Sequence, residues 1–137
     1  MAQSDRDILF ANESFVIGVF QAVAGASLVA ALSQAETLIK YTGRFWFAGF
    51  LTAMAIALLS AVLAAYWKHQ YKLWDVKAQA SAARLQQDEA KVRSDSANTY
   101  LSSMRSAMFV AVISIVAGIV ELVLAFWVVF ARGAQAV

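Results

Sequence analysis

The sequence predicts an all-α integral membrane protein with three transmembrane helices, and two observations lead to this prediction. Hydrophobic residues make up 61% and charged residues 15% of the 137 residues, whereas soluble domains contain about 45–50% apolar and about 25% charged residues. The apolar residues gather in three stretches, residues 15–39, 45–67 and 107–131, and each has the roughly 20 residues that a helix needs to cross a bilayer. We therefore expect a single membrane domain, in which the absence of proline favours nearly continuous helices.

A polar tail, residues 1–14, precedes the first apolar stretch. The tail is net acidic, whereas the start of a secretory signal peptide is basic, so we expect residues 15–39 to be retained as the first transmembrane helix. Polar residues, among them Gln21 and Gln34, lie on several sides of this helix, which disfavours a position fully exposed to lipid. Two interpretations stay open: these side chains hydrogen-bond to neighbouring helices, or the first helix lines a water-filled path opposite the third.

Small residues recur at every fourth position of the second helix, residues 45–67. Lipid provides no hydrophobic force between helices, so small residues stabilise helix pairs by letting the two backbones approach closely. We therefore predict a packing face on this helix that consists of Gly49, Ala53, Ala57 and Ala61, with Ser60 beside it. Packing within one chain and packing between subunits both fit this pattern.

Residues 68–106 form a long polar segment without glycine or proline, a composition that favours helix. A straight helix over residues 68–93, normal to the membrane, would rise about 39 Å at 1.5 Å per residue. The remaining residues barely span the way back to the third apolar stretch. We therefore expect either a helix that lies on the membrane surface or a helical hairpin that turns back part-way.

Two local patterns in this segment carry predictions of their own. The residues of "SDSANT", residues 94–99, favour helix N-caps and predict a new helix start there. An apolar stripe at helical spacing predicts either a partner-binding surface or packing on the protein's own helices; it consists of Tyr71, Trp74, Ala78, Leu85 and Val92.

The third helix, residues 107–131, contains one charged residue, Glu121. An ionised carboxylate at this depth costs from about 3 to more than about 10 kcal/mol, so it needs a partner, water or a proton. On a helical wheel the small and polar residues of the helix lie within about 60° of Glu121; they are Ala107, Ser114, Ala117, Gly118 and Ala125. We therefore expect Glu121 and Ser114 to face protein or water, with Gly118 allowing close packing.

The distribution of lysine and arginine predicts the orientation in the membrane. The N-terminal tail and residues 68–106 hold eight of the eleven basic residues, and the other side holds Lys40, Arg44 and Arg132. The N-terminus and the long segment should therefore be cytoplasmic and the C-terminus outside, in a bacterial inner membrane. The short turn "KYTGR", in which Gly43 can adopt a positive φ, predicts an antiparallel hairpin of the first two helices.

Several classes of function find no support in the sequence. Cysteine is absent and His69 is the only histidine, so neither a metal site nor a catalytic triad is expected, and no cofactor is predicted. Basic residues of the long segment alternate with acidic ones, which argues against nucleic-acid binding. We do not expect an enzyme.

Two hypotheses follow for a membrane protein of this kind. In the first, several copies associate and Glu121 faces the subunit interface or a water path, with Gln21, Gln34, Ser60 and Ser114 as further polar lining; rings of carboxylates line cation-conducting pores. In the second, the chain is a non-catalytic accessory or scaffold subunit that docks on a larger membrane-protein partner. Both place the lipid bilayer around the helices.

The layout of three spans in a chain of this length also resembles that of the three-span phage holins, which oligomerise into membrane lesions. The resemblance covers topology and no specific residues, and it implies a third option, a holin-like pore former. Such holins place the N-terminus outside and end in a basic cytoplasmic tail. In this chain the basic residues predict the opposite orientation, and the tail "RGAQAV" holds one arginine.

Overall fold

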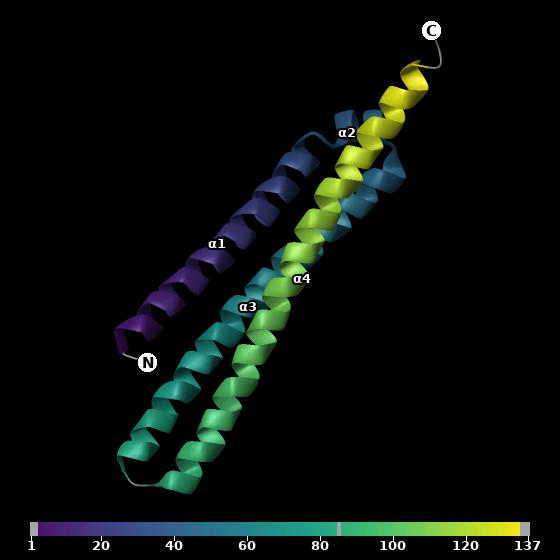
Figure 1. Cartoon of the computed structure of the whole chain (residues 1–137). Coiled ribbons are helices and arrows are strands. Elements are labelled where there is room, and N and C mark those ends of the chain that lie inside the picture. The colour runs from purple at the N-terminus through teal and green to yellow at the C-terminus, as the bar shows by residue number, and fades with distance from the viewer. Residues whose placement is uncertain (1–2, 85, 135–137) are drawn as a thin grey trace.

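The computed structural model describes residues 3–84 and 86–134, and the side chains of residues 11–84 and 86–131. This part of the chain is all-α, as predicted, and contains four helices (Figure 1): α1 (Gln3–Ser33), α2 (Ala35–Thr42), α3 (Arg44–Ala83) and α4 (Gln87–Ala134). Three of them, α1, α3 and α4, are long and apolar enough to cross a membrane.

The two longest helices, α3 and α4, lie side by side along most of their length, and α1 packs on one side of this pair (Figure 1). The short helix α2 connects α1 to α3 at one end of the molecule. At the other end the α3–α4 pair extends beyond the N-terminus of α1 as a helical hairpin.

The first apolar stretch, predicted as one helix over residues 15–39, is interrupted at Gln34. Gln34 has φ −112° and ψ 21°, so it leaves the helical conformation between α1 and α2. The hydroxyl of Ser33 donates to the carbonyl of Ala30 over 2.9 Å, and such side-chain bonds compete with helix continuation. Gly43 then adopts φ +83° between α2 and α3, the positive value expected for this turn.

The segment 68–106 forms a helical hairpin that turns back part-way, the second of the two expected arrangements. α3 runs on to Ala83, and the backbone N–H groups of Arg84 and Gln86 both donate to the carbonyl of Ser81 over 3.1 Å, which closes the turn. α4 already begins at Gln87, so the helix start predicted at residues 94–99 is wrong. Residues 94–99 lie inside α4 instead. The hydroxyl groups of Ser96 and Thr99 donate to backbone carbonyl groups four residues earlier, a bond that serine and threonine can form within a helix.

The predicted apolar stripe of the hairpin divides between two environments. Tyr71, Trp74 and Ala78 are half-buried on the side of α3 that packs on α4, whereas Val92 is 65% exposed. Leu85, like the side chains of Arg6 and Arg132, lies outside the described residues. The larger part of the stripe therefore packs on the protein's own helices.

The interface between α3 and α4 follows one periodicity from end to end. Along each helix, one row of its buried and half-buried residues recurs in alternating steps of three and four, the spacing of a left-handed coiled coil, and Gly49 and Met54 of α3 lie beside this row. On α4 the row consists of Ala90, Arg93, Ala97, Tyr100, Met104, Ala107, Ala111, Ser114, Gly118, Glu121, Ala125 and Val128, and on α3 of Phe50, Ala53, Ala57, Ser60, Ala64, Trp67, Tyr71, Trp74, Ala78 and Ser81. We call this interface the α3–α4 seam. It joins the apolar part of the molecule to the hairpin without interruption.

Small residues bring the two helices close together in the apolar part of the seam. Ala57 and Ala61 are completely buried. A β-carbon added to Gly118 would overlap the terminal methyl of Met54 and lie 3.4 Å from the β-carbon of Ala53. The helices thus meet at a distance that only glycine and alanine permit.

Candidate functional site

The carboxyl group of Glu121 lies in the seam against Gly49 of α3. A β-carbon added to Gly49 would lie 2.9 Å from the Oε2 atom of Glu121, which is closer than real contacts to β-carbons. The seven-residue repeat of α4 turns Glu121 toward α3, and the missing side chain of Gly49 provides the space. Glu121 thus points into protein, as the helical wheel predicts.

Within the described part of the chain, the buried Oε2 atom of Glu121 has no hydrogen-bond partner. Lysine and arginine are absent from the sequence over residues 15–39, 45–67 and 107–131, so the apolar stretches offer no basic residue for an ion pair. A buried acceptor without a partner costs about 1–3 kcal/mol, and more if it is charged. The carboxyl group therefore requires a proton, water, a cation or a group from another chain.

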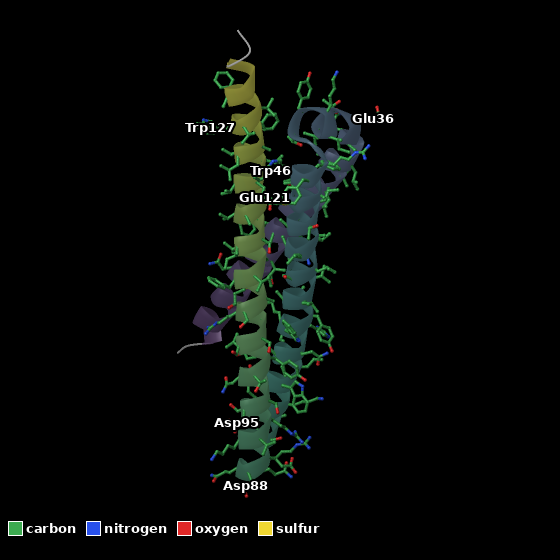
Figure 2. All side chains as sticks on the ribbon, turned by 90° about the vertical axis from the view of Figure 1, so that its right-hand side faces the viewer. Glu36, Trp46, Asp88, Asp95, Glu121 and Trp127 are labelled. Atoms are coloured by element: carbon green, nitrogen blue, oxygen red, sulfur yellow. The ribbon has the colours of Figure 1, made fainter. Side chains whose placement is uncertain are left out.

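The two flanks of the α3–α4 seam differ in what covers them. On one flank α1 packs mainly on α3 and reaches α4 at a few residues; Leu101, Met108 and Leu122 belong to apolar clusters that include Ile17 and Ala31 of α1. Figure 2 views the pair from the opposite flank, with α1 behind it, and shows Glu121 and Trp46 between α3 and α4. We call this second side the open flank.

A groove of about 370 Å³ runs along the open flank and is rich in serine. No residue of α1 lines it; the lining residues are Ser60, Leu63 and Trp67 of α3 and Ser102, Ser103, Ser106, Ala107 and Val110 of α4. Ala107, Ser114 and Glu121 are each seven residues apart, so they lie in one row along the seam. Ser114 thus stands between the serine groove and Glu121.

The structure brings together some of the polar residues singled out from the sequence and separates others. Ser60, Ser114 and Glu121 belong to the α3–α4 seam. Gln21 is half-buried and lines a pocket between α1 and α3 together with Lys68, and Gln34 is exposed at the junction of α1 and α2. Gln21 and Gln34 thus lie apart from the α3–α4 seam that contains Glu121.

The pairing between Gly49 and Glu121 could not be predicted from the sequence. Gly49 was singled out as a packing residue, but the helix that it would meet depends on the register of α3 against α4. Trp46, one turn before Gly49, also lies at the level of Glu121 (Figure 2).

Metal binding finds no support in the described residues, where no group of three or more histidine, aspartate or glutamate side chains comes together. Comparisons of the chain with protein-family models, with curated proteins and with solved structures give no match. The geometry around Glu121 is therefore the strongest indication of function.

Proposed function

We propose that the protein is a self-associating integral membrane protein of the bacterial inner membrane in which Glu121 lines a cation path between subunits. The observation that carries the proposal is the partnerless carboxyl oxygen of Glu121 in the seam, with Ser114 and the serine groove in line with it. The positive-inside rule supports an orientation with the hairpin in the cytoplasm.

The open flank supports self-association. A flank that carries serine side chains is unfavourable against lipid, whereas polar side chains at helix interfaces contribute hydrogen bonds and small residues permit close packing. Within residues 107–131 of α4 the other exposed side chains are apolar, among them Ile113, Val116, Val120 and Phe126, and suit lipid. A second copy would therefore cover the open flank first.

The carboxyl chemistry supports a cation as the conducted species. Several Glu121 side chains around one axis would share protons or cations, because like charges close together cannot all be ionised without a counter-charge. Serine hydroxyl groups provide further oxygen atoms toward the cytoplasmic end. Rings of carboxylates select cations in the same way in known pores.

Flux measurements in liposomes test the proposed conduction. The purified protein should carry protons or K⁺, and Glu121→Gln, which keeps the size of the side chain, should lower the flux at least about ten-fold. Glu36→Gln is the matched control, since Glu36 is exposed on α2 and should leave the flux unchanged. Equal flux from Glu121→Gln and the parent protein, or none from the parent, contradicts the proposal.

Cysteine cross-linking tests the interface independently of conduction. The chain has no cysteine, so Ser106→Cys on the open flank introduces a single thiol without background. Oxidation in membranes should give a covalent dimer for Ser106→Cys and none for Ala22→Cys, whose position is exposed on α1. Cross-linking at Ala22→Cys alone would assign the interface to α1.

The hairpin favours a second candidate function, a non-catalytic accessory or scaffold subunit. It extends beyond α1 and exposes apolar side chains, among them Leu73, Val76 and Val92, that a partner could cover. Affinity purification from native membranes with the parent protein and with Val76→Glu distinguishes the two functions. A larger partner lost with Val76→Glu supports the scaffold, and a homo-oligomer that Val76→Glu leaves intact supports self-association.

A further inference from the structure

A pocket of about 340 Å³ lies between α1 and α3, away from Glu121. Its walls combine basic, polar and apolar residues: Ser14, Ile17, Gly18 and Gln21 of α1, and Ala65, Lys68, His69 and Lys72 of α3. Gly18 leaves its side of the pocket open, because a β-carbon added there would meet nothing within 4 Å.

The basic residues of the pocket gather on one turn of α3. The ammonium group of Lys68 donates to the hydroxyl of Ser14 over 2.6 Å and so ties α3 to α1. Glu13 and Lys72 act electrostatically on Lys68, the first by attraction and the second by repulsion. Lys72 is exposed and forms no ion pair with any side chain in the described part of the chain, so an anion between these lysines would relieve their repulsion.

The pocket lies at the boundary between the apolar stretch of α3 and its polar continuation. Ile17 and Ala65 form its apolar end, whereas Lys68, His69 and Lys72 follow directly on the last apolar turn. Tyr66, Trp67 and Tyr71 neighbour them in the sequence, and such amphipathic aromatic residues prefer the headgroup level of a bilayer. A ligand in this position has a charged part and an apolar part.

We propose that the pocket binds the phosphate group of an anionic phospholipid, with Lys68 and Lys72 around the headgroup and an acyl chain along α1 past Gly18 toward Gln21. Basic pockets between transmembrane helices on the cytoplasmic side bind lipid headgroups in this way. The proposal requires only that the chain is inserted in a membrane, and it stands or falls independently of the proposed conduction.

Native mass spectrometry of the protein from nanodiscs tests the proposal. In discs of phosphatidylglycerol mixed with phosphatidylcholine, the parent protein should retain phosphatidylglycerol in preference to phosphatidylcholine. Each lysine at a membrane surface contributes about a five-fold gain in affinity for anionic lipid, so Lys72→Gln should weaken retention about five-fold. Lys91→Gln makes the same change of charge on the exposed part of the hairpin and should retain lipid like the parent.

A steric variant tests whether the lipid is held in a shaped pocket or is only attracted by the positive charge of the lysines. Gly18→Leu changes no charge and its β-carbon meets nothing within 4 Å, while the rest of its side chain would fill the mouth of the pocket that Gly18 lines. It should lose bound phosphatidylglycerol while its helical circular dichroism stays unchanged. Retention equal to that of the parent in both Gly18→Leu and Lys72→Gln, or equal loss in Lys91→Gln, overturns the proposal.

A last measurement distinguishes a lipid from free phosphate as the source of the ligand. Inorganic phosphate, added at millimolar concentration to the protein in phosphatidylcholine discs, should not bind measurably. In mixed discs it should not displace phosphatidylglycerol. Binding of inorganic phosphate without any preference for phosphatidylglycerol would refute the lipid assignment.

Discussion

Glu121 of α4 occupies the space that a side chain at position 49 of α3 would fill, since a β-carbon on Gly49 would lie 3.1 Å from both the carboxyl carbon and Oε1 of Glu121. The carboxyl group of Glu121 therefore fits in this position because residue 49 has no side chain. This relationship makes the register of α3 against α4 testable by mutation.

Gly49→Ala should lower the free energy of unfolding by about 1–3 kcal/mol, because the added methyl group collides with the carboxyl group. The double variant Gly49→Ala/Glu121→Ala should show a coupling energy of at least about 0.5 kcal/mol that partly restores stability. Unfolding in detergent, followed by circular dichroism, measures both. Gly25→Ala is the control, because a β-carbon there meets nothing within 4 Å; equal stability of the Gly49 and Gly25 variants would contradict the packing described for Glu121.

Gly118→Leu should force α3 and α4 apart and destabilise the protein by at least about 1–3 kcal/mol. The terminal methyl of Met54 can move aside for a small group, but Ala53 and Phe50 also lie within 3.5 Å of the added β-carbon and leave no room for a larger one. The thermal midpoint in detergent is the measurement. Gly18→Leu places the same side chain at an open position and should leave the midpoint near that of the parent.

The tip of the hairpin depends on Arg93. Its Nη1 atom donates to the hydroxyl of Ser81 over 2.6 Å, and its Nη2 atom donates to Oε2 of Glu89 over 3.0 Å. Ser81 is buried, so Arg93→Met should leave its hydroxyl without this donor and cost about 1–2 kcal/mol. Hydrogen exchange at the end of α3 should accelerate in Arg93→Met, whereas Glu89→Gln, which weakens only an exposed ion pair, should change it little. Equal acceleration of hydrogen exchange in Arg93→Met and Glu89→Gln would show that the ion pair, and not the bond to Ser81, stabilises the tip.

The orientation predicted from the basic residues can be checked with single cysteines at exposed positions. In intact cells a membrane-impermeant maleimide should label Thr37→Cys on α2, and it should label Ser94→Cys on the hairpin only after the membrane is opened. The opposite pattern would place the hairpin outside and move the lysine pocket to the outer leaflet.

Composition and length were sufficient to predict the long helices, because each apolar stretch of this chain exceeds the length of a span and contains no proline. The interruption at Gln34 could not be predicted in this way. Neither glycine nor proline stands there, and the break accompanies a bond from the hydroxyl of Ser33 to its own helix. The start of α4 was misplaced for a related reason, since the serine and threonine residues of 94–99 also fit inside a helix when they bond four residues back.

For the candidate site, helical periodicity fixed which residues share a side of α4 and so placed Ser114 and Gly118 near Glu121. It could not tell which helix would cover that side. Several glycine and alanine residues of α3 could have lain opposite Glu121. Only the register of α3 against α4 places Gly49 there. The open flank is likewise a property of where α1 packs, which no periodicity within α1 determines.

The uninterrupted seam has a mechanical consequence. From Gln87 to Glu121, α4 measures about 50 Å at 1.5 Å per residue, and over this length α3 and α4 contain neither glycine nor proline except at Gly49 and Gly118, beside Glu121 itself. A rod without a hinge transmits torque. A force that twists or slides the two helices of the hairpin at its tip would therefore be transmitted along the rod to the level of the carboxyl group.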